Sequence, residues 1–232
     1  TGRRGGVEAG FVAPGAAAYA RGQMDTLTEQ ARSLGAGGLV YIRWTDRGPE
    51  SPAEKFLGKP LVDRFINGAQ PIDAHLFKDD DGTIWLYYGG WRHCNVCRMN
   101  PDMTGFLPFE DGELFKEITP KGYVEGPCML KKDGIYYFMW SMGNWTDGSY
   151  CVAYGTSESP VGPFENKGTI LERQDPVANG PGHHGYLHLP ETDEWLVVYH
   201  RRIIGETEAS SRILCIDRME IADGEIKPVI MT

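Results

Sequence analysis

The sequence predicts a mainly β protein with a repeat architecture such as a β-propeller, preceded by a small α+β module. One hairpin pattern occurs three times, each with a polar residue nine positions before the turn: Asp73 before Gly82, Glu125 before Gly134 and His184 before Asp193. The copies are about fifty to sixty residues apart, which is the spacing expected of a propeller. Upstream of about residue 51 the composition changes, because Gly and Ala dominate and aromatic residues are sparse.

The N-terminal segment predicts a helix between two strands. Residues 20–34 carry four apolar residues at helical spacing, Met24, Leu27, Ala31 and Leu34. Gly35 follows where a C-terminal cap would end the helix. Residues 39–44 predict a strand, and residues 7–12 predict an earlier one. A strand, helix and strand of this size form an α+β module and not a propeller blade.

The hairpin around Asp133-Gly134 is the best formed of the three copies. An apolar run follows Glu125, and an aromatic-rich strand, Ile135-Tyr-Tyr-Phe-Met-Trp140, returns after the turn. Asp-Gly between two β-type runs is a strong hairpin signal, since both residues tolerate positive φ. Each copy therefore places a titratable side chain at the start of a strand. A last strand pair is predicted around Asp223-Gly224.

Charge and composition exclude some classes of function. The net charge of -9 disfavours nonspecific binding to nucleic acid and is compatible with a neutral substrate such as a sugar. No apolar run approaches the roughly 18 residues that a membrane span needs. Five cysteines, an odd number, argue against a complete disulfide framework, and Cys94 and Cys97 are expected to be reduced strand cysteines. With no visible signal peptide, the sequence favours a cytoplasmic location.

Residues 1–57 resemble the GAD domain, an insertion domain of bacterial aspartyl-tRNA synthetase. The resemblance is carried by Phe11-Val-Ala-Pro-Gly-Ala-Ala-Ala-Tyr19, Gln23-Met-Asp-Thr-Leu-Thr-Glu29, Gly35-Ala-Gly-Gly-Leu-Val-Tyr-Ile42 and Ser51-Pro-Ala-Glu-Lys-Phe-Leu57. It implies a peripheral α+β appendage without aminoacylation chemistry. The boundary to the next domain is expected near residue 57, between residues 51 and 58.

Residues 58–232 resemble glycoside hydrolase family 43, whose members are five-bladed β-propellers that act on arabinose- and xylose-containing glycans. The motifs are Ala69-Gln-Pro-Ile-Asp-Ala-His75, Glu125-Gly-Pro127, Ser157-Glu-Ser-Pro-Val-Gly-Pro-Phe164 and Gly180-Pro-Gly-His-His184, supported by Tyr199-His-Arg-Arg202 and Cys215-Ile-Asp-Arg-Met219. The resemblance implies that the leading residues of separate blades converge on one pocket.

The same resemblance assigns roles to two acids. Inverting hydrolysis needs a carboxylic acid that protonates the leaving oxygen and a carboxylate that activates water, roughly 6.5–9.5 Å apart. By resemblance Glu125 is the general acid, and Asp73 is a third carboxylate that raises the pKa of the acid by like-charge repulsion. The alternatives are a solvated acid at a strand end for Glu125 and a turn or capping role for Asp73.

Further site residues follow from the resemblance. His183 is favoured by the motif, and His184 by the repeat register, as the histidine that helps to hold calcium in the central cavity, with water as the other ligand because calcium prefers oxygen. A hydrogen-bonded core histidine is the alternative for either. Trp91 and Trp145 are candidates for stacking on sugars, and Arg201 is a candidate for substrate contact or an ordinary surface arginine. Trp140 is expected to pack in the core.

The sequence departs from the family at its first blade. No hairpin with an Asp general base precedes Asp73, and none of the upstream acids opens a blade-like repeat: Glu8, Asp25, Glu29, Asp46 and Glu50. The expected fold is therefore an incomplete five-bladed propeller after a small α+β module, a chimera-like chain. Three functions are expected: an inverting glycosidase for arabinosyl or xylosyl linkages, which lacks its base and is inactive in this form; a non-catalytic carbohydrate-binding propeller; or a synthetase-derived accessory module whose partner is RNA or protein.

Overall fold

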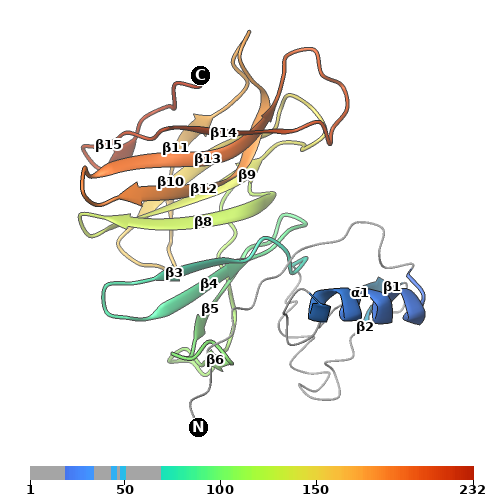
Figure 1. The fold of residues 1–232 in the computed structure, drawn as a ribbon. Helices are drawn as coiled ribbons and strands as arrows, with labels where there is room; N and C mark the ends of the chain where they lie inside the picture. The colour runs from blue at the N-terminus through green and yellow to red at the C-terminus, as the bar shows by residue number, and fades with distance from the viewer. Residues whose placement is uncertain (1–18, 34–42, 46–47, 51–68) are drawn as a thin grey trace. The chain divides into compact units, whose positions relative to one another are not determined.

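The computed structural model of the chain describes residues 19–33, 43–45, 48–50 and 69–232, and it separates two compact units, residues 1–67 and 68–232 (Figure 1). The predicted domain boundary near residue 57 lies outside the described residues. The described part is mainly β, as predicted, with one helix and sixteen strands.

In the first unit, helix α1 spans Arg21–Ser33, which confirms the helix predicted over residues 20–34. The Gln23 side chain accepts a hydrogen bond from the Ala20 backbone amide (2.8 Å), which satisfies one of the amide groups left free at a helix N-terminus. Strands β1 (Arg43–Thr45) and β2 (Gly48–Glu50) form an antiparallel hairpin. The strand predicted over residues 39–44 overlaps β1 at its end, and the one predicted over residues 7–12 lies outside the described residues.

The second unit contains three antiparallel sheets that follow one another along the chain (Figure 1). The first sheet has β3 (His75–Lys78), β4 (Ile84–Tyr88), β5 (Asn95–Met99) and β6 (Phe106–Leu107), with β7 (Lys116–Glu117) also on β5. The second has β8 (Glu125–Lys132), β9 (Ile135–Met142), β10 (Cys151–Ser157) and β11 (Glu165–Leu171). The third has β12 (Asn179–Leu189), β13 (Glu194–Arg202) and β14 (Ile213–Arg218). A short pair, β15 (Ile221–Ala222) and β16 (Glu225–Ile226), follows.

The Asp-Gly turns take the conformation that their residues predict. Asp133 (φ 52°) and Gly134 (φ 81°) join β8 to β9, and Asp223 (φ 56°) and Gly224 (φ 77°) join β15 to β16. Positive φ at both central residues is the requirement of a type I′ turn, which matches the twist of the flanking strands. The hairpin at Asp133-Gly134 and the last strand pair are therefore confirmed.

The third hairpin differs from its prediction in where its first strand begins. His184 was expected to open a strand, but β12 begins at Asn179, so His184 lies inside the strand. The pairing of β12 with β13 is irregular between Asn179 and Gly185. The stretch Gly180-Pro-Gly182 lies in this irregular part, where Gly180 has φ 56°. The sequence did not predict that this strand extends back to Asn179, because glycine and proline usually mark the end of a strand.

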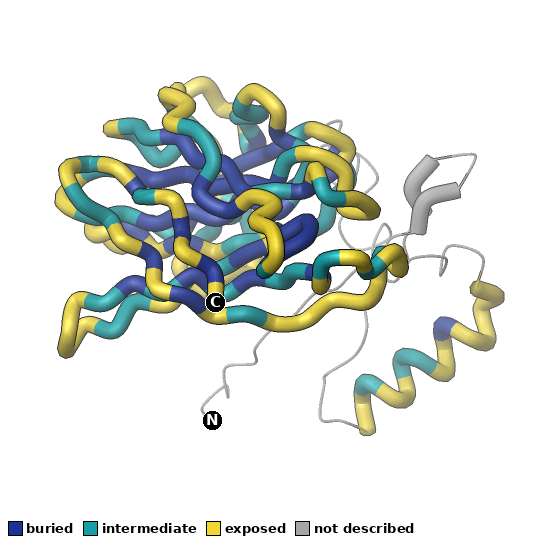
Figure 2. Tube along the Cα trace, turned by 90° about the horizontal axis from the view of Figure 1, so that it is seen from above, coloured by how far each residue is buried: buried dark blue, intermediate teal, exposed yellow. Residues whose placement is uncertain are grey.

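Both faces of the second sheet are apolar, and each face packs against one of the other two sheets. Met129, Phe138 and Trp140 belong to the hydrophobic cluster shared with the first sheet. Leu130 and Tyr137 belong to the cluster shared with the third sheet. Alternate residues of a strand point to opposite faces, so a strand that is buried on both faces is apolar at almost every position. Trp140 is fully buried, which confirms its predicted core role, and Figure 2 shows the buried centre of this unit.

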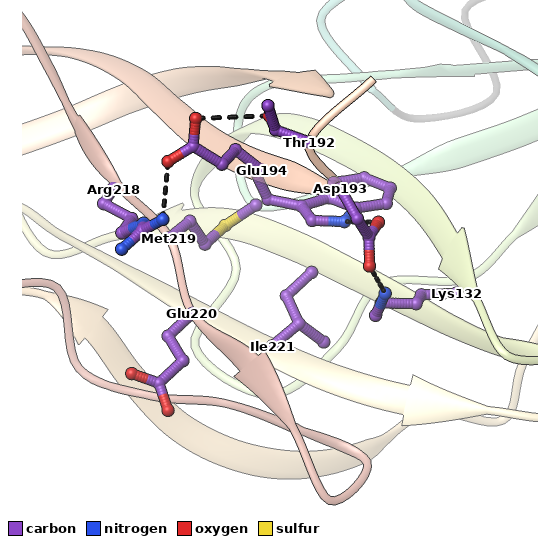
Figure 3. Close-up of a pocket in the computed structure, with 9 residues that line it drawn as sticks. Lys132, Thr192, Asp193, Glu194, Arg218, Met219, Glu220 and Ile221 are labelled. Atoms are coloured by element: carbon purple, nitrogen blue, oxygen red, sulfur yellow. Dashed lines mark hydrogen bonds and ion pairs between the residues drawn. The ribbon is translucent and has the colours of Figure 1, made fainter. Parts of the chain in front are cut away.

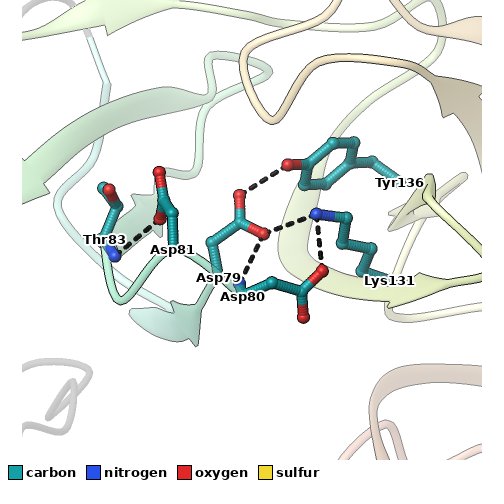
Figure 4. Close-up of polar contacts among 6 residues, drawn as sticks. All are labelled: Asp79, Asp80, Asp81, Thr83, Lys131 and Tyr136. Carbon is teal, nitrogen blue, oxygen red and sulfur yellow. Dashed lines mark hydrogen bonds and ion pairs between the residues drawn. The ribbon is translucent and has the colours of Figure 1, made fainter.

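A buried acid links the first sheet to the second (Figure 4). Asp79, at the end of β3, accepts hydrogen bonds from the Tyr136 hydroxyl (2.5 Å) and from Lys131 Nζ (2.8 Å). Lys131 also pairs with Asp80 (2.8 Å). Burial raises the pKa of Asp79, but the Lys131 and Tyr136 donors outweigh burial, and the net pKa is lowered. The carboxylate is therefore charged and holds the turn of one hairpin against the neighbouring sheet.

Two further expectations concern the described residues. Cys94 and Cys97 are buried free thiols; Cys97 lies in β5 as predicted, whereas Cys94 directly precedes that strand. In the part of the chain that the structure describes, no helix has the length and apolar character that crossing a membrane requires.

Candidate active site

Three titratable side chains from the three sheets meet at one end of the second unit. Asp73 precedes β3 by two residues, Glu125 is the first residue of β8, and His183 lies in β12. One ligand atom of each lies within 4.8 Å of the others. The expected convergence of Asp73 and Glu125 is therefore present, and the histidine that joins them is His183.

Asp73 is held between a backbone amide and the histidine. Its Oδ2 accepts a hydrogen bond from the Gly126 amide (3.0 Å), and its Oδ1 lies 3.7 Å from His183 Nε2. The net pKa of Asp73 is raised to about 6, chiefly by burial and also by the charge of Glu125, while His183 and the Gly126 amide oppose the shift. The carboxyl group is therefore able to exchange a proton near neutral pH.

Glu125 and His183 are positioned by the second sheet. Glu125 Oε1 accepts a hydrogen bond from the Tyr150 hydroxyl at 2.7 Å. Glu125 pairs with Ser141 across β8 and β9, and the hydroxyl of this fully buried serine accepts a hydrogen bond from the His183 backbone amide (3.0 Å). Tyr150 and Ser141 were missed in the sequence, since neither belongs to a recognisable motif.

The backbone at this end of the sheets is strained. Asp73 (φ 58°), Trp91 (φ 54°), Arg92 (φ 66°) and His183 (φ 42°) all have positive φ without being glycine. This conformation costs about 1–2 kcal/mol per residue because Cβ approaches the carbonyl oxygen. Such residues cluster at active sites and persist where surrounding contacts hold them. Trp91 and Arg92 are the central residues of the turn between β4 and β5, where positive φ is ordinary, so Asp73 and His183 are the two that take it outside such a turn.

Two histidines beside the three-residue group have no hydrogen-bond partner for either ring nitrogen: His184 and His200. Burial lowers the pKa of His184 to about 3 and that of His200 to about 4, with the charge of His183 adding to both shifts. Both imidazoles are therefore neutral and keep a free lone pair. His184 is buried, whereas the His183 side chain is 42% exposed and faces Asp73. Neither His183 nor His184 is therefore the hydrogen-bonded core histidine that was the alternative prediction.

The predicted substrate residues divide into two groups. Trp91 and Trp145 are exposed by 52% and 45%, and the Arg212 guanidinium lies over the Trp145 ring at 5.4 Å. Trp91 follows β4, and Trp145 follows β9, at the end of the sheets that holds Glu125. Arg201 instead donates hydrogen bonds to the backbone carbonyls of Val177 and Thr232, which ties β13 to the C-terminal residue.

No residue of the described part is assigned as the general base. Asp73 is too close to Glu125, because inverting enzymes separate acid and base by roughly 6.5–9.5 Å to leave room for water. Of the upstream acids, Asp25 and Glu29 lie on α1 and Glu50 lies in β2. The other two, Glu8 and Asp46, lie outside the described residues.

A separate pocket of about 260 Å³ opens at the opposite ends of the strands (Figure 3). It is lined by Lys132, Thr192, Asp193, Glu194, Trp195, Arg218, Met219, Glu220 and Ile221. Lys132 is the last residue of β8, whereas Glu125 is its first, so the pocket lies about 23 Å along the strand from the three-residue group. It contains none of the predicted site residues.

Comparison with known proteins decides the family. The model of the glycosyl hydrolases family 43 matches residues 49–226. The chain belongs to glycoside hydrolase family 43. It is 45% identical over 203 residues to "Beta-D-galactofuranosidase xynD" of Aspergillus niger, with 86% of this chain and 58% of that protein covered. It also resembles the solved structure of an alpha-L-arabinofuranosidase from Clostridium thermocellum, with 29% identity, a TM-score of 0.58, and 72% of this chain and 56% of that chain covered.

A second family overlaps the N-terminal part of the family 43 match. The GAD domain model matches residues 3–84. Over 82 residues the chain is 39% identical to "Aspartate--tRNA(Asp/Asn) ligase" of Moorella thermoacetica, which covers 34% of this chain and 14% of that protein. The resemblance of the N-terminal segment to the GAD domain is therefore confirmed. The chain spans 58% to 60% of the length of the first family 43 relatives it matches.

Proposed function

We propose that this chain carries the acid half of an inverting glycosidase site for arabinosyl or xylosyl linkages, with Glu125 as the general acid and Asp73 as its modulator. The observation that carries the proposal is the meeting of Asp73, Glu125 and His183, within 4.8 Å, at the strained ends of three sheets. The proposal includes an incomplete five-bladed propeller whose first blade, with the general base, is missing. Hydrolysis by this chain is then slow or absent.

The chemistry needs a proton donor beside the glycosidic oxygen. Glu125 would give its proton to that oxygen as the bond to the anomeric carbon breaks, and the oxygen would keep the electron pair. Asp73 lies beside Glu125, and in this proposal it acts on the acid by like-charge repulsion. Its short separation from Glu125 suits this role and excludes it as the base.

Calcium is part of the proposal, and the residues fit it. His184 has two unpartnered, buried ring nitrogens and a pKa of about 3, so it offers a neutral nitrogen ligand; His183 is the alternative, turned toward Asp73. Calcium binds mostly oxygen, and its remaining ligands would be water. When bound, the ion would supply a fixed positive charge near the two acids.

Turnover of aryl glycosides tests the proposal. Phenyl α-L-arabinofuranoside and phenyl β-D-xyloside are assayed, with the β-D-galactofuranoside included because of the named Aspergillus relative. Sodium azide is added in a parallel assay, since azide attacks the anomeric carbon without a base. We expect azide to accelerate turnover, Glu125→Ala to abolish it, and the exposed Glu158→Ala to leave it unchanged. Equal turnover in Glu125→Ala refutes the site, and a first product of retained configuration refutes inversion.

Two other functions, carbohydrate binding without catalysis and an accessory module for RNA or protein, predict different results. A carbohydrate-binding propeller without catalysis is supported by the exposed Trp91 and Trp145, and it would bind oligosaccharides with no turnover in either assay. An accessory module is supported by the GAD match, and it would bind tRNA or a protein partner. The full chain shifting tRNA in a gel, with a salt-dependent affinity, would favour that function.

A further inference from the structure

We propose that Tyr150 is a positioning residue, which fixes the oxygen of Glu125 that carries the proton. The inference rests on the proposed role of Glu125 as general acid. It adds a residue that belongs to none of the family motifs in the sequence. Tyr150 precedes β10, on the second sheet, and its hydroxyl donates a hydrogen bond to Glu125 Oε1 at 2.7 Å.

The tyrosine ring is held rigidly, so its hydroxyl has little freedom to turn away. Tyr150 is 1% exposed, and its ring stacks on the His200 ring with centroids 5.8 Å apart and planes inclined by 13°. On another side the ring touches the backbone of Gly182, where an added Cβ would lie 2.1 Å from Tyr150 Cε1. No side chain larger than glycine fits at Gly182 without displacing the ring. This contact gives a physical reason for glycine in the Gly180-Pro-Gly182 stretch.

The donor role of Tyr150 determines the state of each Glu125 oxygen. A protonated carboxyl has one hydroxyl oxygen and one carbonyl oxygen, and the carbonyl oxygen is the better acceptor. Burial holds the pKa of the Tyr150 hydroxyl above its ordinary value, so it stays a donor. Oε1 is therefore the acceptor and Oε2 carries the proton. When Oε2 gives this proton to the leaving oxygen, Oε1 gains charge, and the bond from Tyr150 strengthens.

The chain provides a matched control for removal of this hydroxyl. Tyr199 is also 1% exposed, and its hydroxyl also donates to a carboxylate, Asp217 Oδ2, at 2.7 Å. Tyr199 belongs to the core cluster between the second and third sheets. Tyr199→Phe therefore loses the same kind of bond away from Glu125, whereas Tyr150→Phe loses it at the acid and keeps the ring.

Aryl glycosides with different leaving groups separate a role in proton donation from a general loss of structure. A hydrogen bond to a charged group contributes about 1.5–3 kcal/mol. We expect Tyr150→Phe to lower kcat about 10- to 100-fold for the phenyl glycoside, measured with azide present, and to leave the 2,4-dinitrophenyl glycoside nearly unchanged, because that leaving group needs no proton. Gly182→Ala is expected to give the same pattern. An equal loss with both substrates, or the same pattern in Tyr199→Phe, overturns the proposal.

Carbon NMR tests the contact without turnover. Glutamate labelled with ¹³C at the carboxyl carbon gives a Glu125 signal that Glu125→Gln identifies by its disappearance. We expect this signal to move in Tyr150→Phe and to keep its position in Tyr199→Phe. A signal that stays in place in Tyr150→Phe overturns the proposal, whereas wild-type protein without turnover even in azide, combined with a signal that moves, contradicts only the proposed function.

Discussion

Replacing Asp73 by asparagine should stabilise the folded protein at neutral pH, although Asp73 lies at the centre of the site. The Asp73 carboxyl has a pKa of about 6 in the fold, against 3.8 ordinarily, chiefly because burial disfavours its charge. The folded state therefore binds this proton more tightly than the unfolded state does. Stability falls as the pH rises from about 4 to about 6, and it stays at the lower level above that range.

The size of the effect follows from the shift. A difference of about 2 pKa units corresponds to about 3 kcal/mol at pH 7. The Asp73 side chain is 13% exposed, and solvent screening reduces this figure, so we expect a gain of about 1–3 kcal/mol in Asp73→Asn. Asparagine keeps an oxygen that accepts the hydrogen bond from the Gly126 amide, and it loses only the charged contact of Asp73 with His183, 3.7 Å away.

Urea unfolding between pH 4 and pH 7 measures the prediction. The difference in free energy of unfolding between Asp73→Asn and wild type should be close to zero at pH 4 and should grow to its full value by pH 7. Asp193→Asn is the control, since Lys132 and His188 lower the pKa of exposed Asp193 to about 2. Its effect should be destabilising at pH 7, opposite in sign to that of Asp73→Asn. A pH-independent difference in Asp73→Asn would refute the reasoning.

Three other changes test the fold and the calcium proposal. Gly134→Ala places a side chain at φ 81° in the turn and should lower the free energy of unfolding by about 1 kcal/mol in urea. Lys131→Met leaves the buried Asp79 without its cation, and thermal unfolding should show a loss of about 2 kcal/mol. Calcium at 100 times its Kd should stabilise wild type by about 2.7 kcal/mol, and His184→Ala should remove that effect; stabilisation retained in His184→Ala would contradict the assignment. Leu214 is 74% exposed, and Leu214→Lys should change stability by less than about 0.5 kcal/mol in the same scan.

The sequence predicted the features that depend on local chemistry. The turn at Asp133-Gly134 could be predicted because few residue pairs tolerate positive φ at both positions. The helix over residues 21–33 could be predicted from its apolar spacing, and the position of Glu125 at the start of a strand from the apolar run that follows it. In each case a short stretch of chain contains the whole cause.

The features that the sequence did not predict depend on contacts between distant residues. Tyr150 is 25 positions from Glu125, and its hydroxyl reaches the acid only because β9 and β10 bring the two chain segments together. The irregular start of β12 could not be predicted either, because its glycines are explained by the Tyr150 ring beside Gly182. The carbonyl partners of Arg201, on Val177 and Thr232, are likewise distant from it in the sequence.

Residues with positive φ occur at both ends of these hairpins, for different physical reasons. At the turn end, Asp133 and Gly134 have positive φ because the turn requires it, and the residues there tolerate it at low cost. At the site end, Asp73 and His183 also have positive φ, but neither residue lies in a hairpin turn, so contacts with other residues hold this conformation. The Gly126 amide binds the side chain of the first, and the Ser141 hydroxyl binds the backbone of the second. Strain and a buried charge thus coincide at the site end, which is why loss of the Asp73 charge should stabilise the fold while removing the group that tunes the acid.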